Sequence, residues 1–321
     1  MSTAAGWDEA VAALQKAEEV AIACHVNPDG DALGSLLAAH LGLRQLNKKT
    51  YPTWSTASVA LPDSYDFLPG ADALVQMPDV PASDVFLALD CGAGDRLGDL
   101  ERVAGGATTL INIDHHPGNT EFGSINIVDP GASSTAELVA VLLSRLEVKL
   151  DSDIATCLYV GVVTDTGRFQ YSNSRPETLR FAADLLSLGV DAPKIALEIF
   201  ESAPFGYLKL LGRVLERATL YEEESFVTSW ITRADLDEFE VGIEETDKLV
   251  DMVRSTRAAD VTAMFKEQPD GKWRVSLRSK GPSVGAIARR HGGGGHELAA
   301  GFTAGDRDEA IDTIRAELRA G

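Results

Sequence analysis

Residues 20–47 read VAIACHVNPDGDALGSLLAAHLGLRQLN, and their character changes twice. The apolar run over 20–26 predicts a short buried strand, and the helical periodicity that resumes at Asp31 predicts a helix that Asp31 caps or starts. Between them, HVNPDGD (25–31) carries one imidazole and two carboxylates. Pro-Asp-Gly-Asp is also a common turn signature, so this stretch alone leaves two interpretations open: a polar turn, or half of a metal site.

Apolar runs that end in polar groups recur along the first half of the chain. Candidate strands cover 49–54, 84–90 and 109–113, and helical stretches cover 7–19, 133–147 and 152–164. Strands that alternate with helices indicate a parallel sheet covered on both faces. Ligands of such sheets bind beyond the carboxyl ends of the strands, so polar residues there converge although they lie far apart in sequence.

The second part of the chain follows a different pattern. Residues 193–217 predict two helices broken at Ala203-Pro204, then come strands over 218–232, 260–267 and 272–279 and helices over 244–256, 283–291 and 307–320. A length of 321 residues exceeds the usual single domain. We therefore expect an α/β protein with a helix-covered parallel-sheet domain over 1–190, a helical connector over 191–217 and a smaller α/β domain over 218–321.

Composition excludes several classes of protein. Hydrophobic residues make up 45% and charged residues 24%, as in soluble globular proteins, and the net charge of −20 disfavours binding to a long nucleic acid duplex. No apolar run approaches the roughly 18 residues that span a bilayer, and the first residues lack a signal peptide pattern, so we expect a cytoplasmic protein with no membrane partner. Cys24, Cys91 and Cys157 are widely spaced in apolar stretches and predict buried structural thiols.

The polar groups at strand and helix ends have the chemistry of metal ligands. They are His25, Asp29, Asp31, Asp90, Asp114, His115, His116 and Asp165. Carboxylates and neutral imidazoles suit Mn²⁺, with Mg²⁺, Co²⁺ and Zn²⁺ as alternatives. This much negative charge suits two cations that share a bridging aspartate. Two ions roughly 3.5–4 Å apart clamp a phosphoryl group and activate water, so the pattern favours phosphoester hydrolysis.

Taken singly, most of these candidate ligands also have a purely structural interpretation. Asp90 could cap a loop, and Asp165 could be a turn residue at a helix end. The adjacent His115 and His116 are harder to explain, because successive strand residues face opposite ways.

In order and context, His25-x-x-x-Asp29-x-Asp31, Asp90, the triplet Asp114-His115-His116 and Asp165 in TDTGRF resemble the four motifs of the DHH phosphoesterase superfamily. LRSK (277–280) and GGGGHELAAGF (292–302) resemble the DHH-associated C-terminal domain. The length and the GGGGH motif are similar to the NrnA-type group, nanoRNases that also dephosphorylate 3′-phosphoadenosine 5′-phosphate (pAp), some of which hydrolyse cyclic di-AMP or its linear product pApA. The lysine-rich motif of family II pyrophosphatases is not found.

The resemblance implies roles for the first group of motifs. One metal would be held by His25, Asp29 and Asp90, and the other by Asp31, Asp90, His115 and Asp165, with Asp90 as the bridge. Asp114 would accept a hydrogen bond that orients a ligand imidazole. His116 would face the substrate phosphate or the leaving oxygen. Asp90, Asp114 and His116 are therefore the expected catalytic residues, and the 1–190 domain the catalytic one.

The C-terminal motifs predict substrate binding. Successive glycines over 292–295 can turn backbone N–H groups toward a phosphate, although a flexible loop has the same composition. Arg278 can clamp a phosphate through two hydrogen bonds, and His296 adds a donor. The resemblance thus implies that Arg278, Ser279, Gly293, Gly294, Gly295 and His296 bind a short nucleotide or dinucleotide. Arg168, Phe169 and Tyr171 are candidates for base recognition, with core packing as the alternative for the two aromatic residues.

Two other functions stay open. The same metals could serve a pyrophosphatase or polyphosphatase, and a chain of this fold could bind nucleotides as a sensor without catalysis. The complete set of ligands argues against the sensor. The resemblance also implies a homodimer. The sequence does not decide between cyclic di-AMP, pApA, short RNA and pAp as the substrate.

Overall fold

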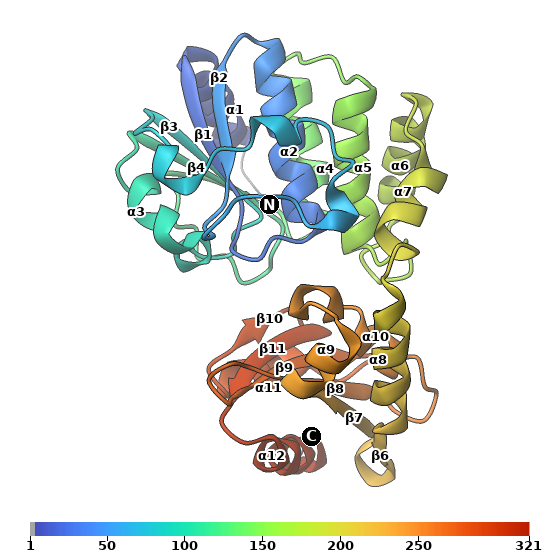
Figure 1. The fold of residues 1–321 in the computed structure, drawn as a ribbon. Helices are drawn as coiled ribbons and strands as arrows, with labels where there is room; N and C mark the ends of the chain where they lie inside the picture. Colours follow the sequence, from blue (N-terminus) through green and yellow to red (C-terminus); the bar gives the residue numbers. More distant parts are fainter. Residues whose placement is uncertain (1–3, 321) are drawn as a thin grey trace. The chain divides into compact units, whose positions relative to one another are not determined.

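The computed structural model describes residues 4–320, which form two compact units, Met1–Ser202 and Ala203–Gly321 (Figure 1). The division falls between helices α7 (Ala192–Phe200) and α8 (Phe205–Glu216), which the sequence predicts as one connector. The three-part division at 190 and 217 stays a prediction, and each unit is described by itself.

The first unit is built on a parallel sheet of five strands in the order β2-β1-β3-β4-β5. The strands are β1 (Glu19–Ala23), β2 (Lys49–Thr53), β3 (Val85–Leu89), β4 (Thr109–Asp114) and β5 (Ile125–Val128). The central strand β3 is buried at every residue, as its unbroken apolar sequence requires. The predicted parallel α/β fold is confirmed, and β1 ends before His25, so the imidazole lies in the loop beyond the strand.

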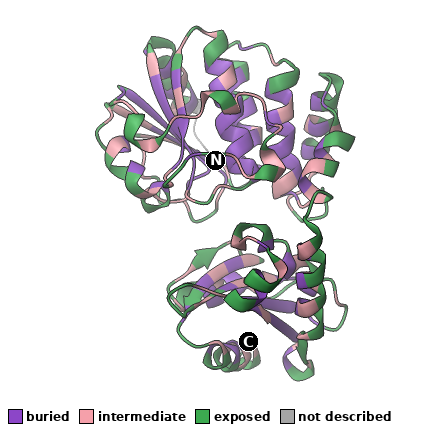
Figure 2. Cartoon of the chain, viewed as in Figure 1, coloured by how far each residue is buried: buried purple, intermediate pink, exposed green. Residues whose placement is uncertain are grey.

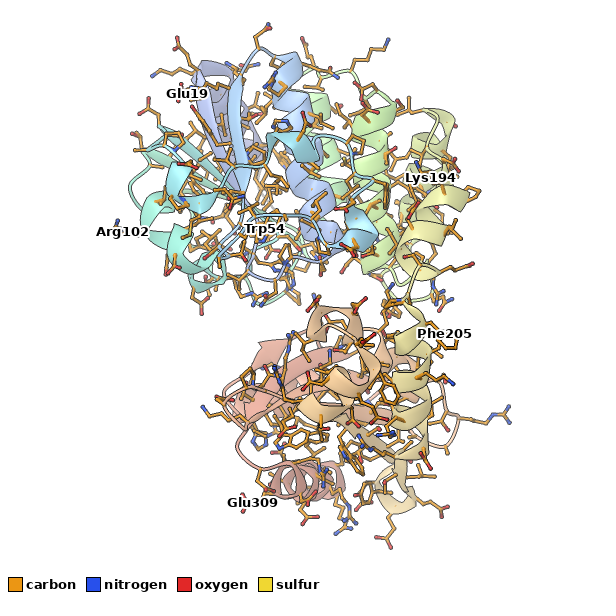
Figure 3. The ribbon with its side chains drawn as sticks, viewed as in Figure 1. Glu19, Trp54, Arg102, Lys194, Phe205 and Glu309 are labelled. Carbon is orange, nitrogen blue, oxygen red and sulfur yellow. The ribbon has the colours of Figure 1, made fainter. Side chains whose placement is uncertain are left out.

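Alternate residues of each strand enter separate cores on the two faces of this sheet. Val20 and Ile22 pack with α1 (Ala4–Lys16), α2 (Gly30–Gln45) and α4 (Thr135–Arg145), and α5 (Ser152–Asp165) joins the same core. Ala21 and Ala23 pack on the other face with α3 (Glu101–Ala104) and the 3₁₀ segment before it. Figure 2 shows the buried strands and helices at the centre of the unit, and Figure 3 labels Trp54 within it while Glu19, Arg102 and Lys194 point outward. The helical elements α6 (Pro176–Ser187) and α7 complete the unit.

Helices α2 and α5 approach closely because both carry glycine at the contact. A Cβ atom at Gly34 would lie 2.3 Å from the carbonyl oxygen of Cys157 and 3.0 Å from the amide nitrogen of Gly161. A Cβ at Gly161 would lie 2.7 Å from Asp31 Oδ1. The close approach therefore brings the C-terminal half of α5 beside the first turn of α2.

The second unit is a mixed sheet of six strands in the order β10-β11-β9-β8-β7-β6. The strands are β6 (Thr219–Tyr221), β7 (Phe226–Ile231), β8 (Val261–Glu267), β9 (Trp273–Ser279), β10 (Gly294–Gly295) and β11 (Ala299–Ala304). Only β7 and β8 pair in parallel. One core joins the sheet to α8, α9 (Arg233–Phe239) and α10 (Leu249–Arg254), and the other to α11 (Val284–Arg290) and α12 (Arg307–Ala320). Short 3₁₀ helices cover Asp63–Tyr65, Ala71–Ala73, Met77–Asp79, Gly94–Leu100, Glu222–Glu224 and Ile243–Thr246.

Some elements of the structure differ in length from the prediction, and others are absent from the prediction. The strand predicted over 218–232 is interrupted at Glu222–Glu224, where Ser225 takes a left-handed φ of 47° and reverses the chain into the β6–β7 hairpin. The helix predicted over 244–256 is a 3₁₀ turn followed by the short α10. The short strand β5, α9 and the glycine-rich β10 and β11 give too weak a periodic pattern to be predicted. Helix α6 is missing from the prediction although its sequence is strongly amphipathic and has a proline in its first turn.

Two predictions from composition can be compared with the structure. Cys24, Cys91 and Cys157 are free and buried, as predicted for structural thiols. Within residues 4–320, no helix is both long enough and apolar enough to cross a membrane.

His40 on α2 makes stability depend on pH. Its side chain is buried, with Nδ1 2.8 Å from Thr50 Oγ1, and burial together with the charge of Arg44 lowers the pKa of His40 to about 4. The unfolded chain takes up a proton near pH 6.5, so this contribution to stability is present above pH 6.5 and is lost as the pH falls toward 4. We expect the free energy of unfolding to fall by about 2 kcal/mol between pH 7 and pH 5 through His40.

Urea denaturation of the natural chain and of His40→Asn at both pH values measures this term. Because Asn cannot take up the proton, the variant should lose about 2 kcal/mol less than the natural chain over the same interval. An equal loss in both chains would show that His40 is not the residue responsible.

Gly34→Ala tests the close packing of α2 on α5. The added methyl group meets backbone atoms that cannot move away, so we expect the free energy of unfolding to fall by about 1–3 kcal/mol. Gly212→Ala on α8 is the matched control, since nothing lies within 4 Å of its Cβ position and alanine favours helix. A Gly34→Ala variant as stable as this control would contradict the packing argument.

Candidate metal centre

The predicted site residues of the first unit gather at the carboxyl ends of its parallel strands. His25 follows β1, Asp90 follows β3 directly, and Asp114 is the last residue of β4 with His115 and His116 just beyond it. Asp29 and Asp31 lie at the start of α2, and Asp165 is the last residue of α5. The fold therefore brings together residues that are up to 140 positions apart in the chain.

The loop from His25 to Asp31 is shaped by its own hydrogen bonds. Asn27 has a left-handed φ of 53°. Asp29 is the N-cap of α2, and its Oδ1 accepts hydrogen bonds from the amides of Asp31 and Ala32 at 3.1 Å. Of the two roles predicted for Asp31, capping is wrong, because Asp29 is the cap; the helix begins at Gly30, so Asp31 is the second residue of its first turn. Asp31 is instead free of the capping role and points a buried carboxylate into the unit.

His25 faces two carboxylates. Its Nδ1 lies 2.9 Å from the carbonyl oxygen of Val26, which leaves Nε2 3.4 Å from Asp90 Oδ2 and 4.0 Å from Asp29 Oδ1. Arg96 Nη2 lies 3.2 Å from Nδ1 and adds positive charge behind the ring. With Nδ1 turned to the backbone, Nε2 is the nitrogen that is placed to bind a metal.

His115 faces three carboxylates, one of which, Asp90, also faces His25. Its Nε2 lies 3.6 Å from Asp165 Oδ2, 3.8 Å from Asp90 Oδ1 and 3.9 Å from Asp31 Oδ2. Donor atoms around one divalent ion at 2.0–2.2 Å lie roughly 3 Å apart, so these separations are close to those of a coordination shell.

The carboxylate of Asp90 connects the two groups. One of its oxygens lies beside His25 and the other beside His115. The donor sets His25, Asp29, Asp90 and Asp31, Asp90, His115 each place their ligand atoms within 4.8 Å of one another. Asp90 also has a left-handed φ of 57°, which costs a non-glycine residue of order 1–3 kcal/mol. The backbone strain thus falls on the residue that both donor sets share.

The electrostatics of the site show an excess of buried negative charge. Burial, then the charge of Asp90, raises the pKa of Asp31 well above its ordinary value, and burial with Asp29 and Asp90 does the same to Asp165. For Asp90, burial is outweighed by the hydrogen bond to His25 and the nearby histidines, which lower its pKa. Carboxylates that resist ionisation in this way need more positive charge than the side chains provide, and divalent cations would provide it.

His116 and Asp114 form a separate pair. Asp114 is fully buried, and its Oδ1 lies 2.7 Å from His116 Nδ1 while its Oδ2 accepts a 2.6 Å hydrogen bond from Asn119. Burial opposes protonation of His116, but this hydrogen bond and the charge of Asp90 prevail and raise its pKa to about 10. Asp114 therefore orients the ring of His116, and the expectation that it orients a ligand imidazole stays a prediction.

In the second unit, Arg278 and Ser279 lie at the end of β9. Arg278 Nε is 3.4 Å from Asp251 Oδ1, so the cation already has an acidic neighbour, and both side chains are about one third exposed. Ser279 is buried, and its Oγ accepts a hydrogen bond from the amide of Gly281. Of the two, Arg278 is therefore the more accessible to a ligand.

The glycine run does not form the predicted nest of four amides. The amides of Gly292 and Gly293 donate to the carbonyls of Arg289 and Ala288, because the last carbonyls of α11 lack partners within the helix. Gly294 and Gly295 pair with β11. A Cβ at Gly293 would lie 2.1 Å from the carbonyl oxygen of Gly301, so this glycine is required by close strand packing. His296 follows β10 directly.

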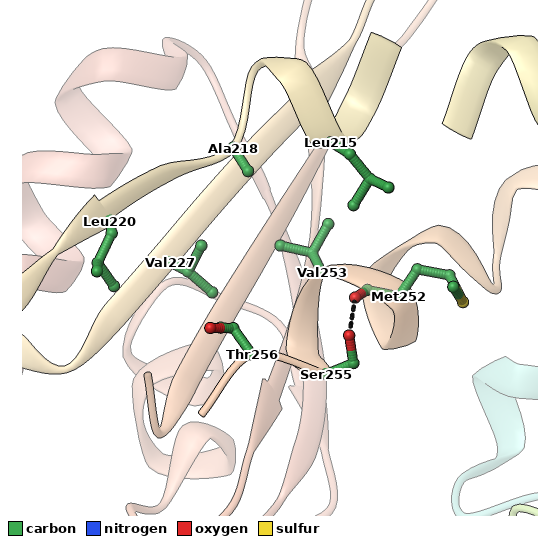
Figure 4. A pocket seen from close by; sticks show the side chains of 8 residues that line it. All are labelled: Leu215, Ala218, Leu220, Val227, Met252, Val253, Ser255 and Thr256. Atoms are coloured by element: carbon green, nitrogen blue, oxygen red, sulfur yellow. Dashed lines mark hydrogen bonds between the residues drawn. The ribbon is translucent and has the colours of Figure 1, made fainter. Parts of the chain in front are cut away.

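Two cavities are lined mainly by apolar side chains and, among the described residues, no histidine or carboxylate lines them. The first, about 270 Å³, is lined by Leu215, Ala218, Leu220, Val227, Met252, Val253, Ser255 and Thr256, and Figure 4 shows that the Ser255 hydroxyl is already bound to the carbonyl of Met252. The second, about 230 Å³, lies between α5 and α7, where the Arg168 guanidinium stacks over the Phe200 ring. Phe169 is partly buried and packs against Tyr159 at the edge of the core, in line with the packing alternative, whereas Tyr171 is exposed.

Sequence reasoning missed several residues that contact the predicted ligands. Thr135 donates to Asp90, Asn119 to Asp114 and Asn173 to Asp165. The run Ser133-Ser134-Thr135 before an apolar helical stretch is a recognisable N-cap signal, but it does not tell which side chains the helix start will contact.

Known proteins match most of the chain. Residues 19–162 match the DHH family, N-terminal domain, and residues 224–320 match the DHHA1 domain. The bifunctional oligoribonuclease and PAP phosphatase NrnA of Thermus thermophilus is 36% identical, over 97% of this chain and 94% of the relative. The NrnA of Bacillus subtilis is 31% identical, over 92% of this chain and 91% of the relative.

A solved structure agrees with these relatives. The crystal structure of an exopolyphosphatase-related protein from Bacteroides fragilis has a TM-score of 0.89 at 27% identity, and the match covers 99% of this chain and 96% of that one. The two family domains fall in the two units described above, and the donor sets lie in the first of them. The chain therefore belongs to the DHH family of phosphoesterases and carries a C-terminal DHHA1 domain.

Proposed function

We propose that this protein is a metal-dependent hydrolase that cleaves short nucleotides, such as pApA, other short oligoribonucleotides and pAp, to mononucleotides. The observation that carries the proposal is the carboxylate of Asp90, whose two oxygens face two separate donor sets. The names of the relatives from Thermus thermophilus and Bacillus subtilis, oligoribonuclease and PAP phosphatase, support the choice of substrate.

The donor atoms fit two divalent cations, and we propose Mn²⁺ because carboxylate oxygens and imidazoles together suit it. His25, Asp29 and Asp90 would hold one cation, and Asp31, Asp90, His115 and Asp165 the other. When bound, such a pair neutralises phosphoryl oxygens and lowers the pKa of water. The separations of 3.4–4.0 Å around His25 and His115 support this assignment, since small movements would complete both shells.

His116 is the proposed proton donor. Its hydrogen bond to Asp114 and the charge of Asp90 raise its pKa to about 10, which favours the protonated ring, and Asp114 fixes the ring through Nδ1. The proton on Nε2 is then the one placed to pass to the departing oxygen of the substrate. Asp114 keeps the imidazolium in one orientation during this transfer, much as a buried carboxylate orients a catalytic histidine in other hydrolases.

The second unit would recognise the part of the nucleotide that does not react. We propose that Arg278, Ser279, Gly293, Gly294, Gly295 and His296 contribute to this recognition. Arg278 would exchange Asp251 for a phosphate, which accepts two hydrogen bonds from a guanidinium. The chain's charge of −20 limits the substrate to short molecules, because a long backbone would be repelled.

An inorganic polyphosphate is the second candidate substrate, since the similar solved structure is described as exopolyphosphatase-related. A turnover panel with pApA, cyclic di-AMP, a short RNA, pAp, pyrophosphate and polyphosphate, each with Mn²⁺, Mg²⁺ and Co²⁺, separates the two. Hydrolysis of the nucleotides supports the proposal, phosphate release from the inorganic substrates alone supports the second candidate, and nucleotide binding without any turnover supports a sensor.

We also propose, on the family resemblance, that the protein is a cytoplasmic homodimer. Light scattering of the purified chain measures its mass in solution. A mass of 34.2 kDa, that of a single chain, at micromolar concentration would contradict the dimer.

Asp90→Asn tests the shared ligand. The amide keeps the shape of the side chain but removes the charge that both cations need, so we expect kcat for pApA with Mn²⁺ to fall at least about 1000-fold. Asp153→Asn, on the exposed side of α5, is the matched control and should keep full activity. Activity of Asp90→Asn within a few-fold of this control would contradict the two-cation site.

Arg278→Ala tests recognition by the second unit. Loss of charge-assisted hydrogen bonds should raise KM for pApA about 10- to 100-fold, while kcat/KM for bis-p-nitrophenyl phosphate, which lacks the second nucleotide, changes little. Arg274→Ala, on the exposed part of the same strand, is the control. Equal losses on both substrates would place Arg278 outside the recognition site.

A further inference from the structure

The four residues Ser133, Ser134, Thr135 and Ala136 span the start of α4, which begins at Thr135, and all are fully buried. We call them the 133–136 segment. None of them is a proposed metal ligand, yet the segment contacts the ligands of the proposed site from one side. It contacts the carboxylates of Asp31 and Asp90 directly and is joined to that of Asp165 through Asn173.

Both oxygens of Asp31 are held by backbone amides of this segment. The amide of Thr135 donates to Oδ2 at 2.6 Å, and the amide of Ala136 donates to Oδ1 at 2.9 Å. These amides belong to the first turn of α4, where N–H groups have no partner within the helix and the helix dipole is positive. The start of α4 thus fixes the plane of the Asp31 carboxylate.

The side chain of the same threonine reaches the shared ligand. Thr135 Oγ1 donates to Asp90 Oδ1 at 2.9 Å, the oxygen that also faces His115. One residue therefore sets the relative positions of Asp31 and Asp90. The Thr135 hydroxyl does not cap the helix, because Ser134 is the N-cap of α4 and the Ser134 side chain accepts a hydrogen bond from the amide of Glu137.

The third carboxylate is joined to the segment by Asn173. Its Nδ2 lies 2.9 Å from the carbonyl oxygen of Ser133 and 3.2 Å from Asp165 Oδ2. Asn173 returns to Asp165 because the chain between them reverses through consecutive left-handed residues, Gly167, Arg168 and Phe169, with φ of 55°, 62° and 63°. Strain of this kind in non-glycine residues is retained where the surrounding structure requires it.

We propose that the 133–136 segment positions the carboxylates for metal binding and that Thr135 is its central positioning residue. The proposal rests on the proposed metal site and deepens it. Holding Asp31 and Asp90 at fixed separation before a cation arrives lowers the cost of gathering like charges, so the segment increases metal affinity without contacting the metal.

Thr135→Val tests this, because valine keeps the volume and the backbone amides but removes the hydroxyl. We expect the Kd for Mn²⁺, measured by electron paramagnetic resonance of the free ion, to rise about 10- to 100-fold. Thr135→Ser should restore the affinity of the natural chain. Thr178→Val is the matched control, since Thr178 is also a fully buried threonine in the first turn of a helix, but its hydroxyl has no hydrogen-bond partner within the described residues.

The outcomes separate the inference from the proposed function. If the natural chain fails to bind Mn²⁺, the proposed metal site is wrong. If it binds Mn²⁺ and Thr135→Val binds as tightly, or if Thr178→Val loses as much affinity, the positioning role is wrong. Asn173→Ala gives a second test through Asp165 and decides the matter if Thr135→Val does not fold: a several-fold rise in Kd supports the segment, and an unchanged Kd contradicts it.

Discussion

The structure of the first unit depends on burying several carboxylates side by side. The charge of Asp90 raises the pKa of both Asp31 and Asp165, while nearby histidines lower the pKa of Asp90 itself. Asp31 and Asp90 are almost fully buried. Such an arrangement is unfavourable unless positive charge or hydrogen-bond donors surround it. The imidazoles, the amides at the start of α4 and, when bound, the cations meet that need, so the elements that deliver them cannot be rearranged independently.

Helix packing follows from the same constraint. Asp31 at the start of α2 and Asp165 at the end of α5 meet only because glycines allow the two helices to approach, and a methyl group at Gly161 would collide with Asp31 itself. The contact that stabilises the fold therefore also sets the spacing of two proposed ligands. This explains why a site at the carboxyl ends of the strands is connected to α2, a helix that is buried along most of its length.

The sequence predicts those parts of the fold and site that depend on neighbouring residues. An apolar run that ends at Asp90 is visible locally, as is the change from strand to helix around HVNPDGD. The contact from Thr135 to Asp31 cannot be predicted in this way, because the two residues are more than 100 positions apart and no spacing rule relates them. The composition of the glycine run suits a nest of amides for an anion, but the sequence does not show that other groups occupy those amides. The last carbonyls of α11, which lack partners within the helix, bind the first two of them.

The charges also determine the order in which the proposed site can work. A chain with a net charge of −20, with several carboxylates at the reacting centre, repels a phosphate as long as those carboxylates are ionised and uncompensated. On the proposed function, the cations would therefore occupy the donor sets before a phosphate approaches His116. The support of Asp31 and Asp90 by the 133–136 segment would then serve this first step rather than the later transfer of a proton.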